Sequence, residues 1–482
     1  FIILPPLLFE GSSAMHIEKL KSNWRTISLL AIPGVIINTL VIALICWRLI
    51  WWGEEHGFLY GLLIGSILAA TDPVSVLALV RNLGAPKRLS VLLEGESLFN
   101  DGTAIVLFNI ILLTTLSVIA GESIGFGEVM TNGIATFIVV VTVGVVVGYL
   151  CGMVANHLLH QSEDHLVEIA LTVALAFGSF LLAELMHGSG VISVVVAGLL
   201  VGNKGAPEGM TPTARVGLHH FWEVASFLVN SILFLLVGYE LQSVIAWNVH
   251  TGFLALVAIM AALIARLVVF PLTSIANIGE VNKIDRKWQF AMWWGGLRGS
   301  IPIALLLLLS HIVHDGQALL IGGNTVNVRL DDSIYSDMLI LAFSVILFTL
   351  LVQGLTMKPL LNKLGIGGRL AESEARYESA LAHLVASRAA LRKLSSLSSQ
   401  GMISEGDRER LAEPYHVSIE KSKSRIFELS ETSLVHAGRI ESARRDLIRV
   451  QIEALRDAER LGQLNPHVIE KTLQALDAAL SI

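Results

Sequence analysis

The stretch Ala69-Ala70-Thr71-Asp72-Pro73 places an acid and a proline inside an apolar run that extends from residue 57 to residue 80. A carboxylate at the centre of a bilayer costs about 2.5–3.5 kcal/mol even on insertion scales, so acids in membrane spans mark ion pathways by default. The next apolar run, 90–118, carries two more acids in GESLFND (95–101), Glu96 and Asp101. These acids predict a membrane protein that moves cations.

The composition is that of a polytopic membrane protein. Of 482 residues, 54% are hydrophobic and 15% are charged, against about 25% charged in an average soluble domain. Apolar runs suited to a hydrocarbon core of about 30 Å fall at 1–15, 27–50, 57–80, 90–118, 129–155, 165–186, 188–203, 218–244, 252–277, 288–313 and 334–358. The first run is short and the chain begins inside it without an initiator Met, so we expect N-terminal truncation.

The basic residues predict which loops face the cytoplasm, because cytoplasmic loops carry the excess of Lys and Arg. One set of alternate loops carries only Arg48 and Arg329. The other set carries Lys19, Lys21, Arg25, Arg81, Lys87, Arg88, Lys204, Arg215, Lys283, Arg286 and Lys287. We therefore place the second set, and the chain after Lys358, in the cytoplasm.

The composition changes after Leu370. Residues 371–482 are rich in charges of both signs, with apolar residues at helical spacing between them. We predict a membrane domain over 1–360 and a cytoplasmic helical tail over 371–482. The tail is either a solvated domain that helps assembly or a regulatory one.

Charged residues from four runs fall at one depth. At about 1.5 Å per residue, Asp72 lies roughly 13 Å and Asp101 roughly 16 Å from the cytoplasmic ends of their runs. Arg266 and Arg298 reach a similar depth in theirs. With Glu96, the layer holds three acids and two arginines, so one Na⁺ or one proton would neutralise it. Competition between the two cations would then be an exchange mechanism.

Two runs also look interrupted. Asp72 followed by Pro73 is typical of a helix start, and the run 288–313 contains GGLRGSIP (295–302). Interrupted helices at matching positions in two halves indicate the central site of a transporter. The two breaks lie an odd number of crossings apart, which predicts an inverted repeat whose first unit needs helices before Phe1.

The oxygen atoms near the first break could bind one cation. Ser97 and Asp101 share a face of the predicted helix, and Asp72 and the backbone carbonyls at Thr71 add further oxygens, the ligands that hard cations prefer. A plainer interpretation exists for each part: Asp72 could only cap a helix, Ser97 could bond its own backbone, and an arginine could merely neutralise an acid.

Four motifs resemble those of sodium/proton exchangers of the NHE and NhaP type: FIILPPLLFE (1–10), TDP (71–73), GESLFND (95–101) and GLRG (296–299). The resemblance covers about residues 1–360. It implies an all-α inverted-repeat antiporter fold of thirteen helices, of which this chain would carry about eleven, with two broken helices. It also implies a homodimer, elevator-like alternating access and, from the tail, a bacterial plasma membrane.

The resemblance also assigns roles to residues at matching positions. Asp101 would be the main carboxylate for the cation and the proton, and Na⁺ would bind at Asp101, Asp72, Ser97 and the Thr71 carbonyl. Asn100 beside Asp101 is similar to the Asn-Asp pair of electroneutral members. Glu96 would be a structural partner of Arg266.

The residues favour an antiporter over two other classes of membrane protein. A channel would need a continuous polar pore, whereas these runs carry isolated charges at one depth. An intramembrane hydrolase would need a nucleophile or metal motif, and the sequence contains neither G-x-S-x-G nor H-E-x-x-H. The two cysteines, Cys46 and Cys151, form no metal spacing. We expect no enzymatic activity, no cofactor apart from the transported Na⁺ and H⁺, and no nucleic-acid partner.

Overall fold

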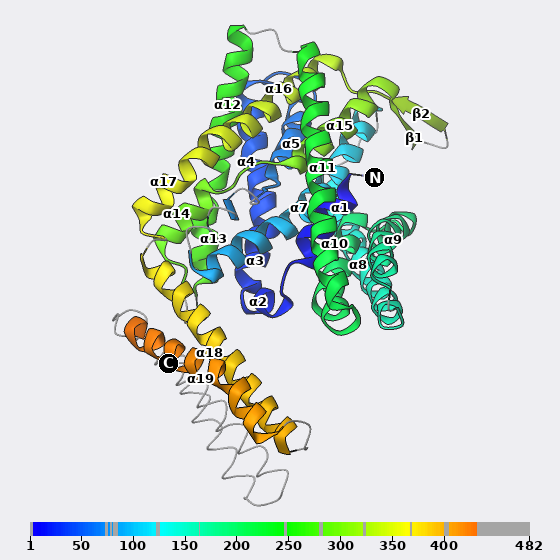
Figure 1. The fold of residues 1–482 in the computed structure, drawn as a ribbon. Helices are drawn as coiled ribbons and strands as arrows, with labels where there is room; N and C mark the ends of the chain where they lie inside the picture. Colours follow the sequence, from blue (N-terminus) through cyan, green and yellow to red (C-terminus); the bar gives the residue numbers. More distant parts are fainter. Residues whose placement is uncertain are drawn as a thin grey trace, which may run out of the picture. The chain divides into compact units, whose positions relative to one another are not determined.

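The computed structural model describes residues 3–72, 76–77, 80, 85–121, 126–162, 164–244, 248–278, 283–321, 324–366, 369–399 and 404–430. Pro73 and the second part of the predicted tail, 431–482, lie outside these residues. The chain divides into two compact units (Figure 1). Unit 1 comprises Phe1–Arg81, Lys87–Gly279 and Ile284–Leu364, and unit 2 comprises Asn82–Pro86, Glu280–Lys283 and Gly365–Ile482.

Unit 1 is built from helices, as the apolar runs predict. Its α-helices are α1 (Leu4–Ser13), α2 (Ile17–Ser22), α3 (Trp24–Ala31), α4 (Pro33–Leu49), α5 (Gly57–Ala69), α7 (Lys87–Ile119), α8 (Phe126–Leu159), α9 (His165–Leu185), α10 (Gly190–Leu200), α11 (Pro212–Val244), α12 (Val249–Arg266), α13 (Val269–Ala276), α14 (Arg286–Trp294), α15 (Ser300–Asp315), α16 (Asp332–Phe348) and α17 (Gly354–Leu364). Two π-helical segments, η1 (Val201–Gly209) and η2 (Thr349–Gln353), continue α10 and α16.

The helices confirm the membrane class. Within the described residues, seven helical spans of at least 18 residues are apolar enough to cross a membrane, and three shorter apolar helices accompany them. One element departs from the predicted all-α fold. The loop after α15 forms an antiparallel hairpin of β1 (Gln317–Ile321) and β2 (Asn324–Val328), with Gln317 paired to Val328.

Small residues bring helix backbones close together in the centre of unit 1. A Cβ atom at Gly61 of α5 would lie 2.6 Å from the carbonyl oxygen of Ala43 in α4, and one at Gly65 would collide with the carbonyl of Thr39. In the same way, α8 approaches α10 where Gly148 lies against the backbone of Ser193. Packing of this kind replaces the hydrophobic driving force that helices lack in lipid.

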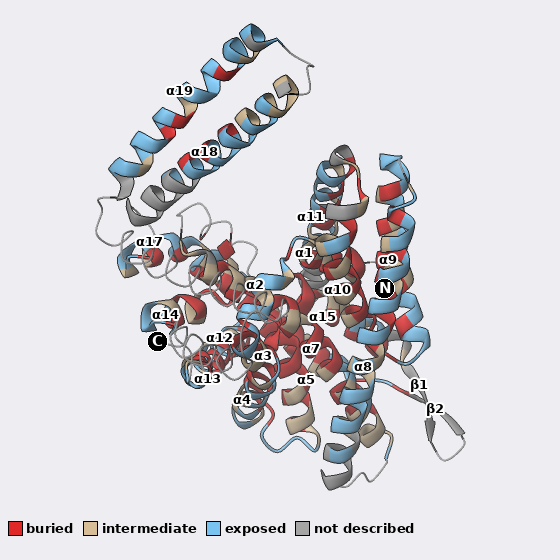
Figure 2. Cartoon of the chain, turned by 90° about the horizontal axis from the view of Figure 1, so that it is seen from below, coloured by how far each residue is buried: buried red, intermediate tan, exposed pale blue. Residues whose placement is uncertain are grey.

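Burial divides the helices into a core and an outer layer. Residues of α5, α7 and α15 are mostly buried, while α8, α9 and α11 expose long apolar faces (Figure 2). Leu150, Leu181 and Leu235 are exposed on these outer helices. An apolar exposed face is what a helix in contact with hydrocarbon requires, so the outer layer agrees with the membrane class.

The chain leaves helical geometry at both stretches that the sequence marks. Helix α5 ends at Ala69, and Ala70 is extended with ψ 139°. Beyond Asp72, the described residues Val76, Leu77 and Val80 are again helical. In the other stretch, α14 ends at Trp294 and α15 begins at Ser300. The inverted repeat and the boundaries of the two predicted domains stay predictions.

Unit 2 contains a helical hairpin. Helices α18 (Arg369–Ser399) and α19 (Glu405–Ser430) lie side by side and run in opposite directions (Figure 2). Ala380, Leu384, Ala412 and Ile419 are buried between them. The helical spacing of the apolar residues in the tail sequence is therefore the seam of a helix pair.

Candidate functional site

The two non-helical stretches bind each other directly. The backbone N–H of Asp72 donates to the carbonyl of Leu297 at 2.8 Å. Gly299 lies against the Asp72 carboxylate so closely that a Cβ atom at this position would collide with it. The glycine is therefore required by close approach, and Asp72 is placed by a stretch more than 200 residues away in the sequence.

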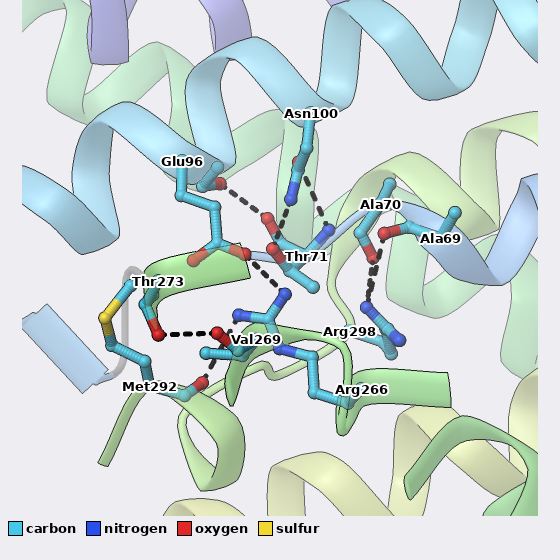
Figure 3. Close-up of polar contacts among 11 residues, drawn as sticks. Ala69, Ala70, Thr71, Glu96, Asn100, Arg266, Val269, Thr273, Met292 and Arg298 are labelled. Carbon is cyan, nitrogen blue, oxygen red and sulfur yellow. Dashed lines mark hydrogen bonds and ion pairs between the residues drawn. The ribbon is translucent and has the colours of Figure 1, made fainter. Parts of the chain in front are cut away.

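The side chain of Arg298 lies at the C-terminal end of α5. Its side chain is 1% exposed, and its Nη1 donates to the carbonyl oxygens of Ala69 at 3.4 Å and Ala70 at 3.1 Å (Figure 3). These carbonyls have no helical partner because the helix ends there, and a cation at a helix C-terminus also opposes the helix dipole. The backbone N–H of Arg298 donates to Thr349 Oγ1 at 3.1 Å, which ties the stretch to the start of η2.

Thr71 is held by two residues of α7. Ser97 Oγ donates to the Thr71 carbonyl at 2.5 Å. Asn100 Nδ2 donates to Thr71 Oγ1 at 2.5 Å, and Asn100 Oδ1 accepts from the Thr71 N–H at 3.4 Å (Figure 3). All three side chains are buried. The Thr71 carbonyl and the Ser97 hydroxyl thus lie at one point, while Asn100 fixes the orientation of Thr71.

Asp101 follows one residue later on α7. Its Oδ1 is fully buried and accepts no hydrogen bond from the part of the chain that the structure describes. Asp101 and Asp72 are close enough for their charges to interact. A buried carboxylate oxygen without a donor is costly, and this oxygen is therefore suited to a ligand that neutralises it.

Glu96, on the same helix, is paired. Its Oε1 forms an ion pair with Arg266 Nη1, and both side chains are at most 6% exposed. Arg266 is the last residue of α12, and its Nη2 also donates to the carbonyl of Met292 at 3.3 Å. Gly296 packs on the guanidinium, where a Cβ atom would lie 2.6 Å from Arg266 Nε. The second non-helical stretch therefore contacts both this ion pair and Asp72.

The structure brings all the predicted site residues into one connected region. Thr71, Ser97 and Asn100 are joined by hydrogen bonds, Asp72 and Asp101 by electrostatic interaction, and Glu96 with Arg266 by an ion pair, while Arg298 contacts the residues just before Thr71. Among the described residues, no group of three or more His, Cys, Asp and Glu side chains could hold a metal ion.

Several of the contacts that position these residues were not predicted from the sequence. It recognised Gly296 and Gly299 as helix breakers, whereas the structure shows that they admit Arg266 and Asp72. It did not identify Thr349 or the Met292 carbonyl. The alternation of glycine and arginine in GGLRG was the available signal, because glycine permits close approach of a bulky charged group.

Comparison with known proteins gives one consistent result. The model of the sodium/hydrogen exchanger transmembrane family matches residues 1–363. The Na(+)/H(+) antiporter ApNhaP of Aphanothece halophytica is 40% identical over 403 residues, which are 82% of this chain and 68% of the relative. The Na(+)/H(+) antiporter NhaG of Bacillus atrophaeus is 35% identical over 438 residues, 89% of this chain and 76% of the relative.

A solved structure has the same fold. The sodium proton antiporter MjNhaP1 from Methanocaldococcus jannaschii, at pH 8, matches with a TM-score of 0.59 over 76% of this chain and 85% of that chain, at 21% sequence identity. At this identity the match supports the fold alone, and it confirms the antiporter fold expected from the sequence. The family match and the curated relatives confirm the resemblance drawn from the four motifs, and the chain belongs to the transmembrane sodium/hydrogen exchanger family.

Proposed function

We propose that this protein exchanges Na⁺, or another monovalent cation, for H⁺ across the bacterial plasma membrane. The observation that carries the proposal is the buried Oδ1 of Asp101, which lacks a hydrogen-bond donor among the described residues and lies near Asp72. The relatives named as Na(+)/H(+) antiporters support the same activity.

The cation site consists of oxygens from two elements. Asp101 and Ser97 come from α7, and Asp72 and the Thr71 carbonyl come from the stretch that follows α5. In the structure Ser97 Oγ donates to the Thr71 carbonyl, so rotation of the hydroxyl would direct both oxygens at a bound Na⁺. Several oxygen ligands with carboxylates among them are what a hard cation needs.

A proton competes with the cation for Asp101. When the carboxyl group is protonated it loses its charge and most of its attraction for Na⁺, so either species neutralises the site. The empty, charged site is disfavoured at membrane depth. The site therefore changes its exposure from one side to the other only when it is loaded, which gives alternating access.

The surrounding charges favour an electroneutral exchange. Arg266 forms an ion pair with Glu96. Arg298 donates to a carbonyl oxygen at the C-terminal end of α5. Neither guanidinium takes part in the exchange. The neighbour of Asp101 is the neutral Asn100, whose amide holds Thr71. One Na⁺ for one H⁺ at a single titrating carboxylate moves no net charge.

The remaining expectations belong to the same proposal. The protein acts as a homodimer, its tail lies in the cytoplasm, and it uses no cofactor. Exposed apolar side chains of α8, α9 and α11 agree with a multi-pass protein in lipid.

The test is transport by the purified protein in sealed vesicles that contain a pH-sensitive dye. An outward Na⁺ gradient should drive proton uptake into the vesicles, with saturation as Na⁺ rises, and empty vesicles serve as the control. Clamping the membrane potential with K⁺ and valinomycin should leave the rate unchanged. A rate that follows the imposed voltage would contradict one-for-one exchange, and Na⁺ flux that needs no counter-ion would indicate a channel. Repeating the assay with Li⁺ and K⁺ establishes which cations are carried.

A further inference from the structure

A groove between α18 and α19 collects basic side chains. Its volume is about 520 Å³. Arg376 and His383 reach it from α18, and Lys421 and Arg425 reach it from α19. All four side chains are exposed at its rim. This groove lies entirely within unit 2 and shares no residue with the membrane site.

The same spacing of lining residues occurs on both helices. In α18 they lie at 376, 379, 380 and 383, and in α19 at 418, 421, 422 and 425. Each set follows the i, i+3, i+4, i+7 pattern of one helix face, which is normally apolar where two helices pack. Here the two faces carry bases and serines with one alanine. Five of these eight side chains are exposed, so the two faces border the buried apolar seam of the helix pair.

Small buried side chains, most of them serines, form the floor of the groove. Ala380 and Ser422 are 5% and 6% exposed. Next to them, Ser387 Oγ donates to Ser418 Oγ at 3.1 Å, and Ser387 is itself buried. Ser379 adds a hydroxyl at the edge. The groove thus offers hydroxyl groups from below and positive groups from the rim.

The described charged side chains that line the groove are all basic. Among the side chains that the structure describes in this hairpin, no aspartate or glutamate lines it. The hairpin is not basic throughout, since Glu420 pairs with Lys423 at 2.7 Å on an exposed part of α19. A concentration of three cationic side chains and a histidine around hydroxyl groups matches the oxygen atoms of a phosphate group.

We propose that this groove binds a small phosphate-bearing anion. The volume falls within the range of about 300–1,000 Å³ that is usual for small-molecule sites, so the occupant is larger than a phosphate ion, of the size of a nucleoside diphosphate or a phospholipid headgroup with its glycerol. Lys421 and Arg425 bind the phosphate oxygens, and the serine hydroxyls donate from the floor. The proposal is independent of the transport activity.

The test is a calorimetric titration of the full-length protein in a non-ionic detergent with three probes: ADP, pyrophosphate and dihexanoyl-phosphatidylglycerol below its micellar concentration. Binding of ADP and pyrophosphate would identify a soluble ligand, and binding of the lipid alone would identify a headgroup. The variant Lys421→Gln/Arg425→Gln should lower the affinity for the bound probe by at least about tenfold, because it removes two charge-assisted hydrogen bonds to the phosphate oxygens.

The matched control is Arg388→Gln/Arg392→Gln, which removes the same charge from α18 outside the groove. It should leave the affinity unchanged. Arg376→Gln tests the groove from the other helix and should lower the affinity for the same probe by a smaller factor. Thermal unfolding checks that each variant is folded. Absence of saturable binding of all three probes would overturn the proposal, as would equal weakening by the two double variants.

Discussion

Two carboxylates on one helix of the membrane unit have opposite surroundings. On α7, Glu96 is 2% exposed and forms an ion pair with Arg266. Asp101, five residues later, has a buried oxygen without a donor from the described residues. Both acids carry the same chemical group on the same helix. What differs is the partner that another helix supplies.

This difference separates a structural acid from an exchangeable one. A buried ion pair contributes little net stability, but removing one partner leaves the other charge buried without compensation. A carboxylate with a buried oxygen that lacks a donor among the described residues is in the opposite position, since removing its charge relieves a burial cost. Substitution of Glu96 or Arg266 should therefore lower the stability of the fold, whereas substitution of Asp101 should lower the transport rate.

The largest effect is expected at Asp101. Asp101→Asn keeps the shape of the side chain but removes the group that binds a proton, so Na⁺-driven proton movement should fall to the level of empty vesicles. The thermal unfolding midpoint in detergent should stay the same or rise. Retained exchange by a folded variant would refute the role that we assign to this residue.

The next effect is expected at the ion pair. Arg266→Met should lower the free energy of unfolding by about 3–5 kcal/mol, because it leaves the Glu96 carboxylate buried without its partner. The double variant Glu96→Leu/Arg266→Met removes both charges and should recover much of this loss. Thermal unfolding of the two variants beside the wild type measures both effects. Equal midpoints for wild type and Arg266→Met would show that the pair does not stabilise the fold.

Gly299 tests the contact between the two non-helical stretches. Gly299→Ala places a methyl group against the Asp72 carboxylate, and overpacking of this kind costs about 1–3 kcal/mol. The displaced Asp72 should also slow exchange in the vesicle assay. Gly178→Ala is the control, since a Cβ atom there meets nothing within 4 Å. If both variants transport at the wild-type rate, the close approach at Gly299 has no functional importance.

The smallest effect is expected at an exposed acid outside the spans. Asp331 caps α16, and hydrogen bonds from the Ser333 N–H and hydroxyl lower the pKa of its carboxyl group. Because the folded-state pKa is below the unfolded one, the stabilisation is present above the ordinary carboxyl pKa and is lost as pH falls through the lowered value. Asp331→Ala should therefore slightly lower the unfolding midpoint at pH 7, and this effect should shrink as the pH falls below the lowered pKa. A difference that persists unchanged in acid would contradict this cause.

Much of the fold could be predicted because membrane insertion is local. Most apolar runs are recognisable from their own residues alone, and the acids Asp72 and Asp101 stand out against their immediate neighbours. The breaks at Asp72 and at residues 295–299 were visible for the same reason, since proline and glycine act on their own backbone. The hairpin of β1 and β2 was missed, because its two strands are only five residues each and interrupt no apolar run.

The contacts of the site could not be predicted in the same way. The hydrogen bond from Arg298 to Ala69 joins residues 229 positions apart, and that from Arg298 to Thr349 depends on how α16 packs. An arginine at membrane depth has several possible acceptors. Only the packing of helices through small residues such as Gly61 and Gly299 selects among them.

The amino-acid sequence by itself determined the membrane class, the places of most apolar helices and the family. These properties follow from hydrophobic transfer and backbone preference, which act residue by residue along the chain. The family resemblance already suggested Arg266 as the partner of Glu96, but only the tertiary structure decided that an oxygen of Asp101 has no donor among the described residues. Ion pairs and hydrogen bonds depend on separations of about 3 Å, and distances of that kind between helices exist only after the chain has packed.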